Sequence, residues 1–322
     1  MHRVTMHRTD GTFPGFNGLP LYYQCWREDD PRNASRNGQP KAKPKAIIAL
    51  VHGLGGHSGF FKNIFHALAP QGYVLYALDL RGHGRSPGQR GYINRWDEFR
   101  QDIDCFISFA TERELKLSHE MRGSSDDALN QPLPCVLMGH SLGGAISLDY
   151  AIRHPNTLAG VVAIAPALGV VGIPPLKMAI GKILSNVWPG FTLHTGINDG
   201  AASRDPAIIS QYQSDPLRHT RGTARLATEF IATAHWIHDH ADQLASPLLI
   251  LQGTADQVSL PEGSDRFFQN VQFPDKTRYE YDGGYHDLHN DTIFGDVLDD
   301  LSHWLEGQIS AATLPSACPI SV

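Results

Sequence analysis

Cysteine is scarce in this sequence and nowhere paired, since Cys25, Cys105, Cys135 and Cys318 lie far apart without a C-x-x-C motif. That spacing is typical of neither a zinc site nor a disulfide framework, and it fits reduced thiols in a cytosol. Basic charge is also short, because 27 Lys and Arg face 33 Asp and Glu, for a formal net charge of -6. We expect no nucleic-acid partner, since binding to phosphate backbones needs a positive surface.

A hydrophobic leader is missing as well. The first residues, M-H-R-V-T-M-H-R-T-D-G, are polar and hold no apolar segment of the kind that a secretory signal needs, so a cytoplasmic location is expected. One uncharged stretch, residues 158–176, is long enough to suggest a membrane span. Because Pro166, Pro174 and Pro175 would break a spanning helix, we predict instead a buried strand at 160–165 that leaves the sheet through an apolar loop.

Short apolar runs alternate with segments of helical period along most of the chain. This alternation predicts an α/β fold in which helices cover a mostly parallel central sheet. Strands are expected at residues 46–51, 73–80, 135–138, 160–165, 247–251 and 277–281, and helices at 60–69 and 94–117. Asn94 is the expected N-cap of the second helix, and the polar stretches 29–45 and 118–131 are predicted to be surface loops.

The alternation stops between residues 168 and 240, where helical segments occur without a clear strand. We predict that this interval is a helical cap inserted into one α/β core. The core is then formed by residues 1–167 and 241–310, and residues 311–322 are a flexible tail.

A serine between two glycines interrupts the apolar run V-L-M-G-H-S-L-G-G-A-I-S-L at residues 136–148. Glycine pairs mark sharp turns of many kinds, but G-x-S-x-G between a strand and a helix is also the turn that raises a nucleophilic serine above the edge of a sheet. On this interpretation Ser141 is the nucleophile. Gly139 and Gly143 are needed where flanking backbone passes too close for a Cβ, and the N–H of Leu142 stays free at the start of the helix.

A serine hydroxyl is a weak nucleophile, so this interpretation needs a base and an acid that orients the base. Asp256 and His286 each follow a predicted strand, where an open parallel sheet presents its functional groups, and they occur in the expected chain order. His289 is the alternative base, but it lies within the next segment, and Asp282 is too close to the end of its own strand. Taken singly, such residues are usually turn or surface residues, and their joint placement favours a catalytic triad.

Two other motifs resemble a cofactor site and a metal site, but each lacks a residue that such a site requires. The loop that begins at Gly53 resembles a dinucleotide-binding G-x-G-x-x-G turn, but Ser58 stands where the last glycine is required. The same loop is better placed to direct a backbone N–H at an oxyanion. His235, His238 and His240 suggest a metal, yet only the first two share a helix face and no H-E-x-x-H glutamate is present. We expect neither a cofactor nor a metal.

Taken together, six motifs resemble the monoacylglycerol lipase and lysophospholipase branch of the α/β-hydrolases. They are H-G-L-G-G-H-S-G at 52–59, L-D-L-R-G-H-G-R-S at 78–86, G-H-S-L-G-G-A at 139–145, S-D-P-L at 214–217, L-Q-G-T-A-D at 251–256 and G-G-Y-H-D-L-H at 283–289. The resemblance implies an α/β-hydrolase fold and the Ser141, His286 and Asp256 triad. It also implies an oxyanion hole formed by the N–H groups of Leu54 and Leu142.

Departures from the family concern the alcohol side of the substrate. Vertebrate members carry a glutamate and an arginine where this chain has Gly56 and Phe60, and cysteines where it has His219 and Ser259. A more apolar alcohol pocket is therefore expected, which weakens the case for glycerol recognition. Tyr212 matches a pocket tyrosine of the cap.

The sequence thus predicts a serine hydrolase that cleaves carboxylic esters through an acyl-enzyme, with monoacylglycerols or similar single-chain lipids as substrates. The alternatives are a lysophospholipase, a thioesterase, a short-chain carboxylesterase, or an inactive ligand-binding α/β-hydrolase. Substrate contacts are expected at Gly53, Phe60, His140, Leu168, Ile183 and Tyr212. An acyl channel is expected along Leu168, Val170, Val171, Ile173, Leu176, Ile180, Ile183 and Leu184. The cap is also a candidate for peripheral contact with a membrane, and the oligomeric state stays open.

Overall fold

The computed structural model describes residues 6–28, 43–122, 131–169 and 175–313. Its strands are β1 (Met6–Pro14), β2 (Pro20–Glu28), β3 (Ile47–Val51), β4 (Val74–Leu78), β5 (Cys135–His140), β6 (Gly160–Ile164), β7 (Thr192–His194), β8 (Arg221–Thr223), β9 (Leu248–Gly253) and β10 (Lys276–Tyr281). Its α-helices are α1 (Lys62–Leu68), α2 (Asp97–Arg122), α3 (Leu142–Arg153), α4 (Pro175–Val187), α5 (Pro206–Ser214), α6 (Ala224–Asp239), α7 (Pro261–Asn270) and α8 (Phe294–Thr313).

One sheet of eight strands forms the centre of the molecule, in the order β1-β2-β4-β3-β5-β6-β9-β10. From β4 to β10 every neighbouring pair is parallel, whereas β1 pairs antiparallel with β2, and β2 pairs antiparallel with β4. The mostly parallel sheet predicted from the alternation of apolar runs is therefore confirmed, with every predicted strand in place.

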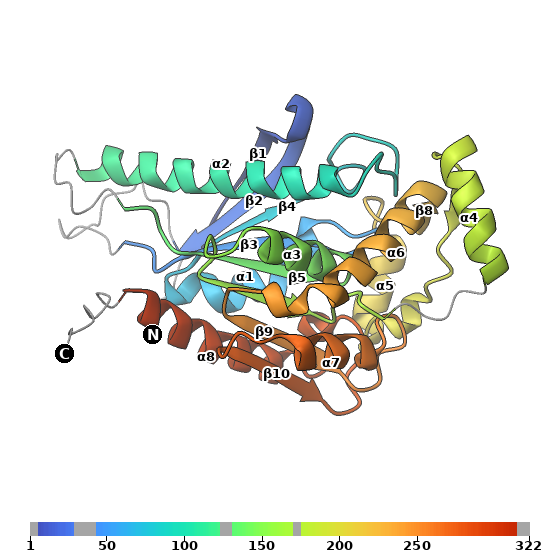
Figure 1. The fold of residues 1–322 in the computed structure, drawn as a ribbon. Coiled ribbons are helices and arrows are strands. Elements are labelled where there is room, and N and C mark those ends of the chain that lie inside the picture. Colours follow the sequence, from blue (N-terminus) through green and yellow to red (C-terminus); the bar gives the residue numbers. More distant parts are fainter. Residues whose placement is uncertain (1–5, 29–42, 123–130, 170–174, 314–322) are drawn as a thin grey trace, which may run out of the picture.

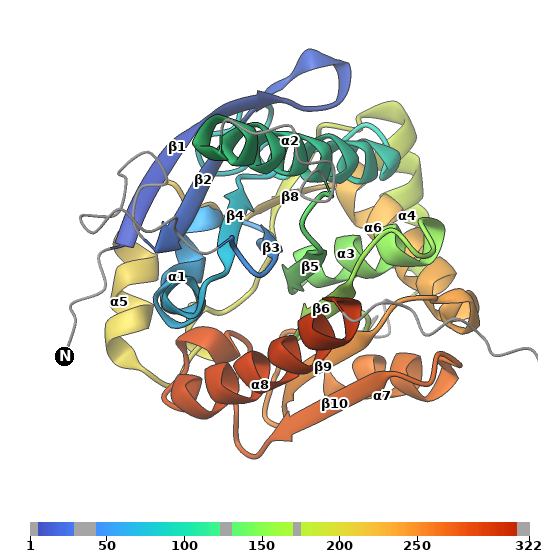
Figure 2. The ribbon, with the colours of Figure 1, turned by 90° about the vertical axis from the view of Figure 1, so that its left-hand side faces the viewer.

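Helices cover both faces of this sheet, as Figures 1 and 2 show. Alternate residues of each strand point to opposite faces. Ile48 and Leu50 of β3 pack in the cluster that contains α1 and α8, while Ile47 and Ala49 pack in the cluster with α2, α3 and α7. Burial on both faces explains why the parallel strands are continuous apolar runs, and it makes the sheet a rigid platform for the loops at its edge.

The first two strands were not predicted. β1 and β2 form an antiparallel hairpin at the edge of the sheet, and most residues of β1 are half-exposed or exposed. A polar edge strand lacks the apolar run by which the central strands were recognised.

Several helix boundaries also differ from the prediction, and α2 runs to Arg122, so residues 118–122 of the stretch predicted as a surface loop are helical. Asn94 does not cap α2, which begins at Asp97; instead the N–H of Asn94 donates to Oε2 of Glu98 at 3.0 Å. A carboxylate in the first turn that reaches back to a free N–H stabilises the helix start in place of a cap at Asn94. At the other end of the chain α8 continues to Thr313, into the segment predicted as a tail, and residues 314–322 lie outside the described part.

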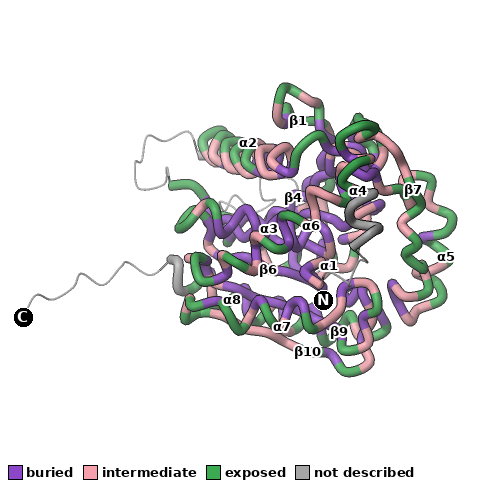
Figure 3. The backbone as a smooth tube through the Cα atoms, turned by 45° about the vertical axis from the view of Figure 1, so that its right-hand side comes forward, coloured by how far each residue is buried: buried purple, intermediate pink, exposed green. Residues whose placement is uncertain are grey.

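The interval between β6 and β9 contains α4, β7, α5, β8 and α6. Figure 1 shows α4, α5, α6 and β8 gathered at one end of the molecule, beyond the central sheet. β7 and β8 form a short antiparallel pair that the sequence did not indicate. Figure 3 shows β7, α5 and the described part of α4 as largely exposed or half-exposed segments to one side of the buried sheet. Within the described residues, no helix combines the length and the apolar character needed to cross a bilayer.

Candidate active site

Ser141 occupies the sharp turn between β5 and α3. Its backbone has φ 56° and ψ -119°, an unfavourable region for a residue with a side chain, and its N–H donates to the carbonyl of Ile164 at 3.0 Å. A Cβ on Gly139 would lie 2.1 Å from the carbonyl oxygen of Gly143, and a Cβ on Gly143 would lie 2.1 Å from that of Val51. Both glycines are therefore required by close backbone contacts, as the sequence predicted, and they hold the serine in its strained conformation.

Asp256 and His286 are joined in the loops that follow β9 and β10. Nδ1 of His286 lies 2.8 Å from Oδ2 of Asp256, and both side chains are buried. The other carboxylate oxygen accepts from the N–H groups of Val258 at 2.8 Å and Ser259 at 2.9 Å, and Nε2 of Gln252 donates to Oδ2 at 3.2 Å. These donors hold Asp256 as an acceptor and leave Nε2 of His286 as the ring nitrogen free for proton transfer.

The two candidate bases, His286 and His289, differ in their surroundings. Burial opposes the charged form of His286, but the hydrogen bond and charge of Asp256, together with the charge of Asp287, raise the pKa of His286 above its usual value. His289 is fully buried against Phe61, and neither of its ring nitrogens has a hydrogen-bond partner among the described residues. Burial lowers the pKa of His289 to about 3. Of the two imidazoles, that of His286 is therefore the one that a described carboxylate orients.

The glycine loop after β3 lies against the serine. A Cβ on Gly53 would be 2.9 Å from the Cβ of Ser141, so only glycine fits there. The N–H groups of Leu54 and Leu142 donate to no acceptor within the described residues, and both residues border the same cavity as Ser141. Two free N–H groups beside a hydroxyl are the arrangement that stabilises an oxyanion. Oγ of Ser141 makes no hydrogen bond to His286 in the described part of the chain, and such bonds often tighten only when substrate binds.

Residues from the segment between β6 and β9 bind this loop from the other side. Nε2 of His57 lies 2.8 Å from Oδ2 of Asp215, which follows α5, and the N–H of His219 donates to the carbonyl of Gly55 at 3.1 Å. Gly55 has φ +75°, and a Cβ there would lie 2.0 Å from the carbonyl oxygen of His219. The inserted segment and the glycine loop are thus in direct contact.

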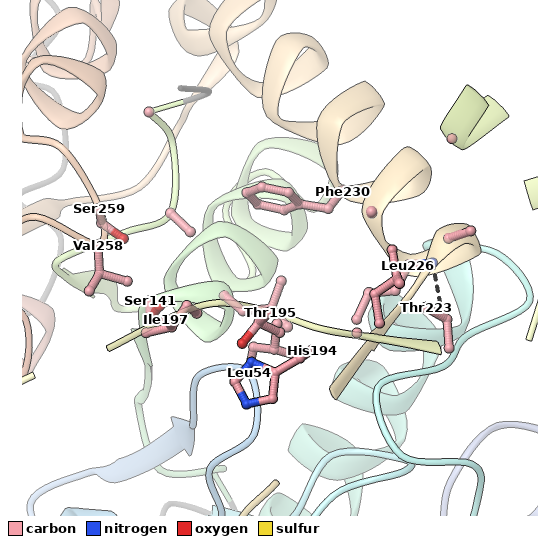
Figure 4. Close-up of a pocket in the computed structure, with 18 of the residues that line it drawn as sticks. Leu54, Ser141, His194, Thr195, Ile197, Thr223, Leu226, Phe230, Val258 and Ser259 are labelled. Atoms are coloured by element: carbon pink, nitrogen blue, oxygen red, sulfur yellow. Dashed lines mark hydrogen bonds between the residues drawn. The ribbon is translucent and has the colours of Figure 1, made fainter. Parts of the chain in front are cut away.

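A cavity of about 570 Å³ opens beside Ser141. Figure 4 shows Ser141 with Val258 and Ser259 along one part of its wall, and Thr223, Leu226 and Phe230 along another. Its lining is formed by Leu54, Ser141, Leu142, Ala167, Gly169, Gly181, Leu184, Leu193, His194, Thr195, Ile197, Gly222, Thr223, Ala224, Leu226, Ala227, Phe230, Val258 and Ser259. Most of these groups are apolar and none is acidic or a lysine or arginine, so the cavity suits a hydrocarbon chain.

Comparison with known proteins identifies the family of this chain. A family model described as serine aminopeptidase, S33, matches residues 42–293. The chain belongs to this family. Over 304 residues it is 28% identical to a protein named monoacylglycerol lipase from Mycolicibacterium smegmatis, covering 94% of this chain and 98% of that one. Over 289 residues it is 29% identical to the monoglyceride lipase of Mus musculus, covering 88% and 89%.

A solved structure gives the same result for the fold. The crystal structure of the Paleococcus ferrophilus monoacylglycerol lipase matches with a TM-score of 0.72 at 29% identity, over 94% of this chain and 99% of that chain. The parallel sheet, its flanking helices and this likeness confirm the α/β-hydrolase fold that the resemblance to the monoacylglycerol lipase and lysophospholipase branch implied.

Only some of the substrate contacts expected from the sequence lie beside the serine or line the cavity. Gly53 adjoins the serine as described, but Leu168 does not line the cavity: it packs in the core, where its carbonyl lies 3.0 Å from Nε2 of His238. Ile183 is 62% exposed and also lies outside the lining, whereas its neighbour Leu184 belongs to it. Of the other expected channel residues, Val170, Val171 and Ile173 lie outside the described residues, as do the side chains of Leu176 and Ile180.

Phe60, His140 and Tyr212 lie on the other side of the proposed base and do not line the cavity. The rings of Phe60 and Tyr212 stack with centroids 4.6 Å apart, and the ring of His140 is 4.8 Å from that of His286. Of these three residues, His140 is therefore the one whose ring packs against His286.

Several lining residues were missed from the sequence. Leu193 and Ile197 come from β7 and the loop after it, and Phe230 lies on α6. The helical period around residue 230 indicates an apolar helix face but not which part of the protein that face contacts. Leu193 belongs to no sequence pattern that would indicate a place in the cavity wall.

Within the described residues, one group of side chains has ligand atoms close enough for a metal: His140, His286 and Asp287, all within 4.8 Å. Nε2 of His140 is already 3.2 Å from Oδ1 of Asp287, and Nδ1 of His286 contacts Asp256. These hydrogen bonds account for the group without an ion.

Proposed function

We propose that this member of the S33 family hydrolyses carboxylic esters that carry one medium or long acyl chain, with monoacylglycerols or similar single-chain lipids as substrates. The observation that carries this proposal is the apolar cavity at Ser141, next to the buried pair of His286 and Asp256. The names of the relatives from Mycolicibacterium smegmatis and Mus musculus support the same class of substrate.

In the proposed mechanism, Oγ of Ser141 attacks the ester carbonyl carbon while Nε2 of His286 takes the hydroxyl proton. The carbonyl oxygen becomes an oxyanion held by the N–H groups of Leu54 and Leu142, and Asp256 stabilises the imidazolium. Collapse of this intermediate breaks the bond to the alcohol, which leaves with the proton from His286, and an acyl-enzyme remains. Water then repeats the sequence with the same groups and releases the fatty acid.

We also propose that residues 168–240 act as a cap that selects the acyl chain. The support is that α4, β7, β8 and α6 contribute most of the cavity wall, while the glycine loop and the Ser141 turn supply its floor. A chain that lies in this cavity gains about 0.8 kcal/mol per methylene removed from water, so binding favours longer acyl groups until the cavity is filled.

The family description names a peptidase. The residues that line the cavity distinguish this alternative from an esterase. An aminopeptidase must bind the positive α-amino group of its substrate, for which a carboxylate is the usual partner. None of the described residues that line the cavity is Asp or Glu. The structure therefore favours an ester of a fatty acid over a peptide.

A substrate panel tests the proposed function directly. Hydrolysis rates are measured for p-nitrophenyl esters, monooleoylglycerol, trioleoylglycerol, lysophosphatidylcholine and an aminoacyl p-nitroanilide. We expect monoacyl substrates to be cleaved far faster than trioleoylglycerol, whose additional chains have no place in one cavity. A preference for the anilide, or equal rates on the two glycerides, contradicts the proposal.

We also propose that this protein is cytoplasmic and that its cap contacts membranes peripherally. The support is an exposed apolar surface on the cap. Ile183 and Trp188 are each 62% exposed, Val187 is 80% exposed, and Leu193 and Ile197 are exposed as well as lining the cavity. Such a surface beside a cavity mouth is suited to taking lipid from a bilayer. Vesicle flotation of wild type and Trp188→Ser tests this, and equal flotation of the two proteins argues against it.

A further inference from the structure

We propose that Asp287 is a second buried carboxylate that acts on the proposed base: it holds His286 in position, favours its protonated form during the reaction and connects it to the cap. This inference rests on the proposed function, because it takes His286 to be the base. Asp287 touches no substrate group, so its role is that of a positioning residue.

Asp287 directly follows His286 and is bound from several segments of the chain. Its Oδ2 accepts from the hydroxyl of Tyr212 at 2.6 Å, and its Oδ1 lies 3.2 Å from Nε2 of His140, the residue before the nucleophile. Its N–H donates to the carbonyl of Ala202 at 2.7 Å. The side chain is buried, so these contacts replace water. One carboxylate therefore joins the base loop, the end of β5 and the segment that contains α5.

The hydrogen bonds around Tyr212 require that its proton points at Asp287. Nδ2 of Asn290 donates to the Tyr212 oxygen at 3.0 Å, and Oδ1 of the same amide accepts from Asn63 at 3.1 Å, which fixes its orientation. Since the Tyr212 oxygen already accepts, its hydrogen is available for Asp287, which must accept it as a carboxylate. The tyrosine ring is held in place by stacking on Phe60.

The titratable groups around His286 come from four segments of the chain. Asp256 follows β9, Asp287 lies on the same loop as His286, His140 ends β5, and His289 lies in the turn before α8. Ligand atoms of His140, His286 and Asp287 lie within 4.8 Å of one another. A carboxylate at this range favours the imidazolium that forms when the base takes a proton. Burial opposes ionisation of Asp287, but the charge and hydrogen bond of His140, followed by smaller contributions from His286 and His289, lower its pKa well below the usual range.

Arg218 is a cation that contacts this network at Tyr212. Its guanidinium carbon lies 5.0 Å from the centre of the Tyr212 ring, and its Nη2 donates to Asp199 at 2.8 Å. Because Arg218 is paired with Asp199 and separated from Asp287 by the tyrosine, it leaves most of the negative charge of Asp287 directed at the histidines.

The test is the pH dependence of kcat/KM for a p-nitrophenyl ester, measured from about pH 4 to about pH 9. Asp287→Asn keeps the shape and removes the charge, so the imidazolium loses stabilisation and the acid limb moves to lower pH by about one unit or more. Tyr212→Phe keeps the charge of Asp287 and removes the hydroxyl that donates a hydrogen bond to it. The carboxylate then stabilises the imidazolium more strongly, so the acid limb moves to higher pH. In the double variant, Tyr212→Phe has no further effect on the limb. Asp282→Asn, an exposed carboxylate on the same loop, is the matched control and leaves the limb in place.

The opposite directions of the two shifts distinguish this role from a purely structural one. If Asp287→Asn and Tyr212→Phe lower the melting temperature but leave the acid limb of wild type, Asp287 only anchors the cap and the inference is overturned. If Asp287→Asn does not fold, the upward shift in Tyr212→Phe decides alone. Ser141→Ala is assayed alongside: retained activity in that variant contradicts the proposed function, whereas its loss together with unmoved limbs contradicts this inference only.

Discussion

A single glycine in the cap offers a sharp test of the acyl channel. Gly181 lies within α4 and lines the cavity, and apart from its chain neighbours and the backbone of its own helix no described atom lies within 4 Å of the position that a Cβ would take. Leucine at this position therefore fits without a clash and fills part of the cavity. The new side chain adds about four carbons, so it displaces a similar length of acyl chain. At about 0.8 kcal/mol per methylene, the loss reaches about 3 kcal/mol, or about two orders of magnitude in kcat/KM, for the longest chains.

The assay is kcat/KM for p-nitrophenyl esters from acetate to palmitate. Gly181→Leu is expected to spare acetate, to reduce palmitate most, and to move the preferred chain length downward. Replacing glycine inside a helix also stabilises that helix by about 1 kcal/mol, so misfolding is not the expected outcome. Gly307→Leu is the matched control, because Gly307 is an exposed glycine of α8 with the same free space around it. An equal loss on acetate and palmitate, or no loss on either, refutes the channel.

Three further experiments test the site. His286→Ala should reduce kcat by about four orders of magnitude, whereas His289→Ala should lower the melting temperature and retain most of the activity, and the reverse order would make His289 the base. Activity on short esters should rise with pH through the elevated pKa of His286, because only the neutral imidazole accepts a proton; a limb below the usual pKa of a histidine would contradict the stabilising carboxylates. Gly143→Ala should unfold at much lower temperature in calorimetry, since its Cβ would meet the Val51 carbonyl, and an unchanged melting temperature would show that the turn can relax.

The central strands were predictable because both faces of the sheet are buried. The residues of β3, β4 and β6 are buried throughout, so each reads as a short apolar run in the sequence. β1 carries no such run, because it lies at the sheet edge with little of its surface covered. The position of Ser141, Asp256 and His286 followed from the strands, since each comes just after one and the ends of parallel strands meet at one edge.

The cavity was less predictable, because tertiary contacts decide which face of a helix lines it. Ile183 and Leu184 are neighbours in sequence and equally apolar, yet the first faces outward and the second lines the cavity. The opposite wall comes from residues around Leu226 and Phe230 on α6, far along the chain. The network of Asp287 and Tyr212 was missed for the same reason: a residue pair 75 positions apart leaves no local pattern.

The central claim is that Ser141 forms the acyl-enzyme, and peptide mass spectrometry of the labelled protein tests it most directly. Wild type is incubated with a long-chain fluorophosphonate, digested, and compared with Ser141→Ala, whose fold is checked by circular dichroism. The account predicts one adduct, located on the peptide that contains Ser141, with loss of ester hydrolysis in parallel, and neither adduct nor turnover in the folded alanine variant. An adduct on another residue, or ester turnover that persists in Ser141→Ala, contradicts it.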